Sequence, residues 1–256
     1  MFVMLNTQKT PIVGMIVPPA GGKVPPEPSI MYPGCVNFIA EGLGLERLTA
    51  NGYDAVIDKI GTVSQTLKVR GANTISLMGT SLSFYKGVEF NRKLVEIIKL
   101  ATGLPAMTMS DGIVEALRTV GASKIGVGTA YVGSVNERLR NFLEVSEFTM
   151  GAIESMDIEN VENILGVNGD DILHLGERVN SRAPDADAIF LSCGGLQTVC
   201  VVSLLEAQYQ KPVITSATAG AWAAVRMIGL SGKASGFGRL AELDHEPATS
   251  TLHAMI

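Results

Sequence analysis

The chain has 256 residues, of which 46% are hydrophobic and 18% are charged, and its net charge is −5. This composition allows a sizeable buried core and excludes a disordered chain. An acidic balance without a long basic run argues against nucleic acid or an anionic membrane as a partner. The apolar run at the N-terminus is too short for a signal peptide, and no run reaches the roughly 18 residues that span a membrane.

Cysteines and histidines are few. The three cysteines, Cys35, Cys193 and Cys200, form no CxxC pair, so the sequence predicts neither a disulfide framework nor a zinc site. Free thiols are typical of a reducing cytoplasm, where we expect the protein to reside. Two of the three histidines, His245 and His253, lie near the C-terminus, which leaves too few for a histidine-centred metal site.

In the first half of the chain, apolar runs alternate with a helical pattern. Residues 12–17, 74–79 and 106–109 read as buried strands. Between the last two, the apolar spacing predicts a helix near 87–101, which Gly103 ends. Strands that alternate with helices indicate a parallel sheet with right-handed crossovers.

The same plan restarts in the second half. Strands are predicted at 124–128, 188–192 and 213–216. A capping box that begins at Ser134 predicts a helix after the first of these, and another helix is expected near 196–209. The second half therefore also predicts a parallel α/β arrangement.

A weak internal repeat relates the two halves. The segments TISLMGTSL and AIFLSCGGL share one pattern, and they place Gly79 and Cys193 at matching points. We expect an α/β protein of two pseudo-symmetric lobes, each with a central parallel sheet of about four strands flanked by helices. The first lobe would comprise residues 1–120 plus 217–256 and the second residues 121–216. Because ligands bind at the carboxyl ends of parallel strands, the site is expected in the cleft between the lobes.

Cys193 follows a predicted strand and precedes two glycines. A free cysteine is most often a packed core residue, and we interpret Cys200 in this way. At Cys193, however, the glycines would let a ligand approach the backbone, and the helix expected just after it would offer an anion site. We therefore interpret Cys193 as functional and assign no role to Cys35.

Several hydroxyl groups also follow strands. Thr80 and Ser81 come after the strand at 74–79, where they would cap a helix, hold a carboxylate, or do both. Tyr131 follows the strand at 124–128 and could donate to an oxyanion, although packing alone would also explain it. Tyr53 carries a weaker signal of the same kind.

Two glycines after a strand, Gly126 and Gly128, suggest part of a dinucleotide fingerprint. Tyr131 occupies the place of the third glycine, and no acidic residue ends a plausible next strand. We therefore reject a nucleotide site. The sequence also lacks a phosphate-binding loop and a nucleophile elbow.

Five motifs resemble the arylmalonate decarboxylase family of the aspartate/glutamate racemase superfamily. They are GMIVPPA at 14–20, FIAEGLGL at 38–45, SLMGTSLSFYKG at 76–87, TAY at 129–131 and LSCGGL at 191–196. The resemblance follows the same order along nearly the whole chain. It implies a racemase-like fold and a decarboxylation of disubstituted aryl- or vinylmalonates to enantiopure monocarboxylic acids. The implied partner is a small malonate, no metal or organic cofactor is implied, and the chain would be a monomer or dimer.

The resemblance also implies roles for individual residues. Cys193 would be the proton donor. An oxyanion hole would comprise Thr80, Ser81, Tyr131 and the backbone N–H groups of Ser81, Cys193 and Gly194. The pocket wall would comprise Pro18, Leu43, Tyr53, Gly79, Val161 and Ile164, where Ile164 stands in place of the usual methionine.

One absence separates the chain from the racemases of the superfamily. Racemases carry a cysteine in each lobe, whereas the position that matches Cys193 in the first lobe is Gly79. A single thiol can protonate only one face of a substrate, so we expect an optically pure product. A racemase, a cis–trans isomerase of a small diacid, a decarboxylase of aliphatic malonates and a non-catalytic acid-binding protein remain as alternatives.

Overall fold

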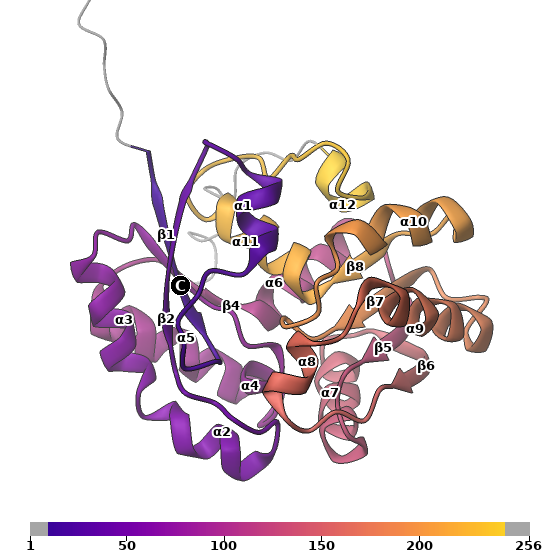
Figure 1. The fold of residues 1–256 in the computed structure, drawn as a ribbon, viewed down its shortest axis with the longest axis horizontal. Helices are drawn as coiled ribbons and strands as arrows, with labels where there is room; N and C mark the ends of the chain where they lie inside the picture. The colour runs from indigo at the N-terminus through magenta and orange to yellow at the C-terminus, as the bar shows by residue number, and fades with distance from the viewer. Residues whose placement is uncertain (1–9, 244–256) are drawn as a thin grey trace, which may run out of the picture.

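A computed structural model describes residues 10–243, which fold around two parallel sheets (Figure 1). The stretch read for a signal peptide lies almost entirely outside these residues, as do His245 and His253. The first sheet has the strand order β2-β1-β3-β4. Its strands are β1 (Ile12–Val17), β2 (Asn37–Gly42), β3 (Thr74–Leu77) and β4 (Ala106–Thr108).

The second sheet repeats this arrangement with the order β6-β5-β7-β8. Its strands are β5 (Lys124–Thr129), β6 (Thr149–Ser155), β7 (Ala188–Ser192) and β8 (Val213–Thr215). Every pairing in both sheets is parallel. The expected fold of two similar α/β halves, each with a four-stranded sheet, is therefore confirmed.

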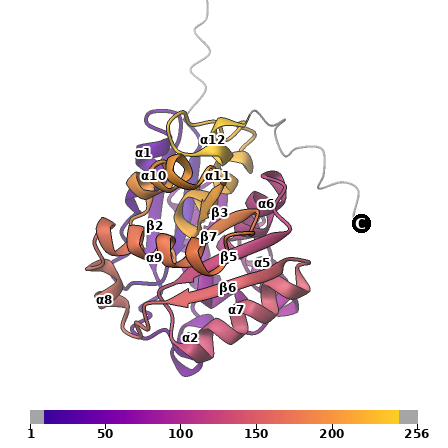
Figure 2. The same cartoon turned by 90° about the vertical axis from the view of Figure 1, so that its right-hand side faces the viewer.

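Helices flank both sheets, as Figure 1 and the turned view in Figure 2 show. In the first half they are α1 (Pro26–Met31), α2 (Ala50–Ile57), α3 (Ile60–Val69), α4 (Thr80–Phe84), α5 (Val88–Thr102) and α6 (Met109–Thr119). The later helices are α7 (Gly133–Val145), α8 (Val161–Leu165), α9 (Gly169–Arg182), α10 (Val199–Tyr209), α11 (Ser216–Arg226) and α12 (Arg239–Glu242).

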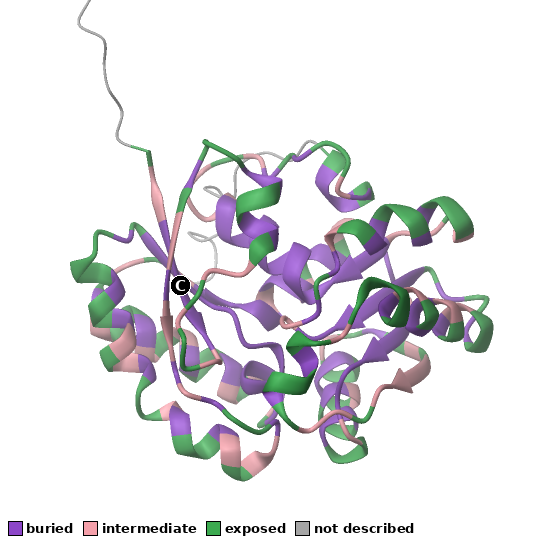
Figure 3. Cartoon of the chain, viewed as in Figure 1, coloured by how far each residue is buried: buried purple, intermediate pink, exposed green. Residues whose placement is uncertain are grey.

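Burial explains why these strands form. Strands β3 and β7 are buried along their whole length, as expected of parallel strands that helices cover on both faces. Figure 3 shows in purple how the buried residues gather in the sheets and on the inner sides of the helices. Gly126 and Gly128 of β5 make room for α9, because a Cβ atom added there would lie 2.8 Å from Val179 and 2.9 Å from Leu175. Close helix packing therefore accounts for the two glycines that resembled a nucleotide fingerprint.

Two predicted helix starts are wrong. Helix α7 begins at Gly133, and its N-cap is Val132 without any side-chain cap, so the capping box at Ser134 does not form. Helix α10 begins at Val199, because residues 193–198 form turns rather than a helical start. The helix expected immediately after Cys193 is therefore absent from that position.

Helix α11 lies against α1 and α6, both of which belong to the first half. This packing is what we expect if the residues from 217 onward complete the first lobe. The lobe boundaries themselves stay a prediction. Within residues 10–243, none of the helices has the length and apolar character needed to traverse a bilayer.

Candidate active site

The ends of two matching strands carry the candidate site. After β3, Gly79 is the N-cap of α4, and Thr80 and Ser81 are the first two residues of that helix. After β7, Cys193 and Gly194 begin a turn. A Cβ atom added at Gly194 would lie 3.5 Å from the carbonyl oxygen of Met78, so this turn approaches the end of β3 closely. The two halves therefore meet at these strand ends, as expected.

Cys193 is a buried thiol with a relative exposure of 7%. Burial raises its pKa to about 11, and contacts with the N–H groups of Gly195 and Leu196 and the hydroxyl of Tyr131 oppose this rise. A thiol with this pKa is protonated at neutral pH. Cys193 is therefore suited to donate a proton rather than to attack as a thiolate.

Two tyrosine hydroxyls lie near this thiol. Tyr131 is fully buried, and its hydroxyl accepts a hydrogen bond from Ser192 Oγ at 3.4 Å. Burial raises the pKa of Tyr131 well above its usual value, and the nearby Cys193 raises it further. Burial likewise raises the pKa of Tyr53, whose hydroxyl lies beside Ser81 and Cys193. Both phenols therefore stay protonated and can donate hydrogen bonds.

Tyr53 and Thr80 have spare donor capacity. The Tyr53 hydroxyl is buried without a hydrogen bond of normal geometry to any described residue. Thr80 Oγ1 donates to the thioether sulfur of Met109 at 2.9 Å, and a thioether is a weak acceptor. A carboxylate placed between these groups would offer both hydroxyls a stronger acceptor.

The backbone donors agree only in part with expectation. The N–H of Cys193 donates to Ser216 Oγ at 3.1 Å, so it already has an acceptor in this structure, and its expected role as an oxyanion donor stays a prediction. The N–H of Gly194 donates to no other described residue. The N–H of Gly194 therefore remains the expected backbone donor to an oxyanion in the second half.

Apolar side chains flank the two strand ends. A Cβ atom added at Gly79 would lie 3.2 Å from Pro18 Cγ, and one added at Gly195 would lie 3.0 Å from Ile164 Cγ2. Leu43 and Val161 are also buried. The backbone of Val161 donates to the carbonyl of Glu46 at 3.1 Å, which joins α8 to the segment that carries Leu43. The predicted wall residues thus come from both halves.

The other two cysteines lie away from this cluster. Cys35 is exposed in a loop, in line with its lack of an assigned role. Cys200 is also exposed, so its interpretation as a core residue is wrong. It lies in the first turn of α10, a position at which its side chain faces solvent. Within residues 10–243, no group of three or more His, Cys, Asp or Glu side chains could hold a metal ion.

Sequence reasoning missed Ser216, the hydrogen-bond acceptor for the N–H of Cys193. A signal was present, because Ser216 directly follows β8 and β8 pairs in parallel with β7. Residues that follow neighbouring parallel strands meet at one edge of the sheet. The strand-end rule that selected Cys193 could therefore have selected Ser216.

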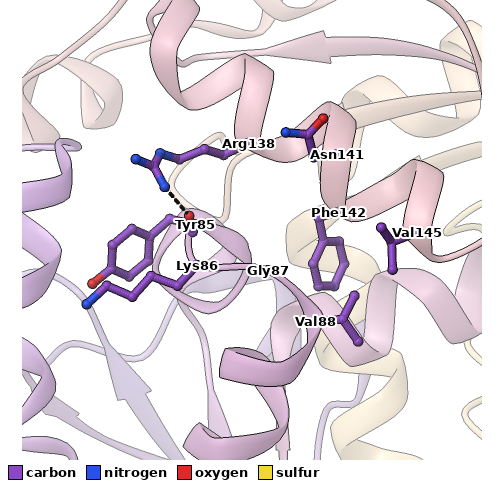
Figure 4. Close-up of a pocket in the computed structure, with 8 residues that line it drawn as sticks. All are labelled: Tyr85, Lys86, Gly87, Val88, Arg138, Asn141, Phe142 and Val145. Carbon is purple, nitrogen blue, oxygen red and sulfur yellow. Dashed lines mark hydrogen bonds between the residues drawn. The ribbon is translucent and has the colours of Figure 1, made fainter.

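A groove of about 420 Å³ opens between the segment after α4 and helix α7 (Figure 4). Arg138 donates to the carbonyl of Tyr85 at 2.7 Å at one side, and Phe142 lines the other. Tyr85 lines the groove, and its ring centroid lies 4.6 Å from that of Tyr53. Tyr53 is therefore next to a residue of the groove wall. None of the groove's lining residues belongs to the group around Cys193, which is the chemically better equipped site.

The model of the family described as arylmalonate decarboxylase matches residues 13–241. The chain belongs to the arylmalonate decarboxylase family. Arylmalonate decarboxylase of Bordetella bronchiseptica is 44% identical over 237 residues, which cover 92% of this chain and 98% of the relative. The chain is accordingly an enzyme of a carboxy-lyase family.

Solved structures agree with this assignment. A liganded double mutant of arylmalonate decarboxylase superposes with a TM-score of 0.88 at 43% identity, over 90% of this chain and 98% of the other. The maleate isomerase Iso from Pseudomonas putida S16 superposes with a TM-score of 0.84 at 20% identity, over 91% and 98%. The second similarity concerns the fold alone.

Proposed function

We propose that the protein decarboxylates disubstituted aryl- or vinylmalonates without a cofactor and delivers the product's α-proton from Cys193. The observation that carries this proposal is a buried thiol with a raised pKa at a strand end, with the hydroxyls of Tyr53 and Tyr131 close to it and Ser81 beside Tyr53. Acid groups and oxyanion donors in one water-poor site are what such a reaction requires.

The retained carboxylate binds between the two strand ends. Thr80, Ser81, Tyr131 and the N–H of Gly194 supply the donors, and the buried hydroxyl of Tyr53 adds one more. As CO2 leaves, the electrons of the broken C–C bond spread onto this carboxylate as an enediolate. Each preorganised donor that meets the growing charge is worth roughly 3–4 kcal/mol.

The leaving carboxylate faces the apolar wall. Pro18, Leu43, Val161 and Ile164 offer it no hydrogen-bond donor from their side chains. A carboxylate without donors is poorly solvated, and conversion to neutral CO2 removes that penalty. An aryl or vinyl substituent conjugates with the enediolate and lowers the barrier further.

Cys193 then transfers its proton to the α-carbon. The resulting thiolate contacts the N–H groups of Gly195 and Leu196 and the hydroxyl of Tyr131, and it recovers its proton from solvent. Gly79 occupies the matching place in the first half, so one face of the enediolate meets no second thiol. The product is therefore a single enantiomer.

The liganded double mutant supports this pairing of positions. It replaces a glycine by cysteine and a cysteine by serine, and the two sites are as far apart along that chain as Gly79 and Cys193 are here. A racemase or cis–trans isomerase is the alternative, favoured by the fold shared with maleate isomerase. A mechanism with two opposed thiols would need a partner for Cys193 that Gly79 does not supply.

The test is a decarboxylation assay of the purified protein with 2-methyl-2-phenylmalonate and EDTA, with the product analysed on a chiral column. We expect CO2 release and one enantiomer of 2-phenylpropionate. Loss of optical purity from added 2-phenylpropionate, or interconversion of maleate and fumarate, without CO2 release would establish the alternative instead. Binding of carboxylates without any turnover would identify a non-catalytic protein.

A further inference from the structure

The turn that carries Cys193 is held at both of its ends by side chains from elsewhere in the chain. At its start, the N–H of Cys193 donates to Ser216 Oγ at 3.1 Å. At its end, the N–H of Thr198 donates to Glu27 Oε1 at 3.2 Å. Both contacts are buried, so water competes little with either hydrogen bond.

Glu27 is an unusual residue for this place. Its relative exposure is 1%, and burial raises the pKa of its carboxyl group, while the N–H of Thr198 opposes that rise. No cation of the described part of the chain contributes to this shift. A buried carboxylate without a cation is costly, and its hydrogen bonds to backbone N–H groups offset only part of that cost. The hydrogen bond from Thr198 is therefore one of the few polar contacts that offset the burial of Glu27.

A chain of hydroxyl groups joins the two anchors of the turn, which are the hydrogen bonds of Cys193 to Ser216 and of Thr198 to Glu27. Thr198 Oγ1 lies 2.7 Å from Thr215 Oγ1, which in turn lies 2.9 Å from Thr218 Oγ1. Thr215 directly precedes Ser216 at the junction of β8 and α11. The end of the turn at Thr198 is thus tied to the same junction that anchors its start.

The groups between the anchors define the surroundings of the thiol. The N–H groups of Gly195 and Leu196 face Cys193 Sγ, and a Cβ atom added at Gly195 would lie 3.9 Å from that sulfur. The N–H of Leu196 also donates to the carbonyl of Cys193 at 3.3 Å. A shift of the turn therefore moves the thiol and its stabilising donors together.

We propose that Ser216 and Glu27 are positioning residues, which fix the turn 193–198 and thereby aim the thiol of Cys193 at one face of the enediolate. This inference rests on the proposed decarboxylase function for its kinetic consequence. We assign neither Ser216 nor Glu27 a contact with the substrate. Both act through the backbone hydrogen bonds at Cys193 and Thr198.

The experiment compares Ser216→Ala and Glu27→Ala with a matched control, Glu206→Ala. Glu206 is also a buried carboxylate, and it accepts the N–H groups of Val213 at 2.9 Å and Arg239 at 2.8 Å, away from the thiol. Glu27→Gln serves as the rescue, because its amide oxygen can still accept from Thr198. All proteins are assayed for kcat, KM, enantiomeric purity of the product and hydrogen exchange of the turn 193–198.

We expect Ser216→Ala and Glu27→Ala to lower kcat about 10- to 100-fold with a smaller change in KM, because a displaced turn misaligns the thiol, while among the proposed binding groups it carries only the N–H of Gly194. Optical purity should fall, and exchange of the turn's amides should accelerate. Glu27→Gln should restore most of the loss, and Glu206→Ala should lose thermal stability without these changes.

The positioning role is wrong if both alanine variants match Glu206→Ala in kcat and leave hydrogen exchange of the turn unchanged. Ser216→Ala alone decides the matter if Glu27→Ala does not fold. If the wild-type protein does not decarboxylate malonates, the proposed function fails, and hydrogen exchange still decides whether the two residues hold the turn.

Discussion

At the scale of single residues, the environment of Cys193 decides which chemistry a thiol can perform. A cysteine nucleophile needs a lowered pKa, whereas an acid must keep its proton until the transition state. Burial raises the pKa of Cys193 to about 11, and this places the residue on the acid side. The sequence shows the cysteine but not this balance between burial and hydrogen bonding.

Replacement of the thiol tests this role directly. Cys193→Ala should lower kcat by on the order of 10²- to 10⁴-fold, the usual contribution of a general acid. Its circular dichroism spectrum should match the wild type, since alanine fits the same backbone. The control is Cys200→Ala, at an exposed site, which should keep full activity. Near-normal turnover by folded Cys193→Ala would remove the thiol from the mechanism.

Tyr53→Phe separates stability from catalysis. Its hydroxyl is buried with no normal hydrogen bond to a described residue, so its removal should leave the free energy of unfolding unchanged or raise it by up to about 1 kcal/mol. If the substrate carboxylate is the missing partner, kcat/KM should fall by on the order of 10²-fold. Urea denaturation and steady-state kinetics measure the two effects. The control is Tyr209→Phe, at the last residue of α10, which should change neither the unfolding free energy nor kcat/KM. Equal losses of kcat/KM in the Tyr53 and Tyr209 variants would contradict a role of Tyr53 in binding the carboxylate.

Gly79→Cys should add a second acid–base group on the opposite face. We expect the variant to exchange the α-proton of a 2-arylpropionate in D2O, as proton NMR would show. The new Cβ atom would lie 3.2 Å from Pro18 and 3.3 Å from Leu82, so overpacking should cost about 1–3 kcal/mol of stability. The control Gly79→Ala has the same Cβ atom without the thiol. Exchange in neither variant would mean that Gly79 does not lie opposite Cys193.

At the scale of elements, the strands with continuous apolar runs could be predicted, and strands without such runs could not. The runs of β1, β3, β5 and β7 are near-continuous because helices cover both faces. Two edge strands escaped the analysis: β2 carries Asn37 and Glu41, and β6 is only partly buried. An edge strand needs no such run, since one of its sides meets solvent.

The residues of the candidate site likewise fall into those that the sequence predicts and those that it does not. Thr80, Ser81 and Cys193 follow directly from the rule that ligands bind where parallel strands end. The anchors of the turn do not, because Glu27 lies 171 residues from its partner Thr198. Contacts over such separations depend on the tertiary fold, and one sequence carries no periodicity that reports them.

In the proposed site, helix α8 forms part of the apolar wall, and this gives a prediction for substrate size. Ile164 is buried against Gly195, whereas Leu165 on the same short helix is exposed. Ile164→Ala should raise the ratio of kcat/KM for a naphthyl- over a phenylmalonate about 10-fold, because one buried hydrophobic contact is worth 1–3 kcal/mol in discrimination. Leu165→Ala is the control and should leave the ratio unchanged. An equal change of this kcat/KM ratio in both variants would mean that the aryl group does not contact Ile164.

At the scale of the whole molecule, the buried thiol makes folding stability depend on alkaline pH. The pKa of Cys193 rises from 9.0 to about 11 on folding, so the unfolded chain releases this proton first. Its contribution is therefore complete below pH 9.0 and is lost as the pH rises towards 11. The loss approaches about 3 kcal/mol over that range.

Urea denaturation at several pH values between 7.5 and 10.5 measures this effect. The difference in unfolding free energy between the wild type and Cys193→Ala should shrink steadily above about pH 9. The comparison cancels lysine and tyrosine titration, which both proteins share. Parallel stability curves for the two proteins would show that the thiol titrates alike in the folded and unfolded chains.

The burial of Cys193 also affects how the protein reacts with oxidants. Peroxides attack the thiolate, and Cys193 is both covered and protonated at neutral pH, whereas Cys35 and Cys200 are open to solvent. Air and mild peroxide should therefore modify the two surface thiols first, and link molecules through them, while turnover persists. A preparation kept without reductant would then gain covalent dimers before it loses activity.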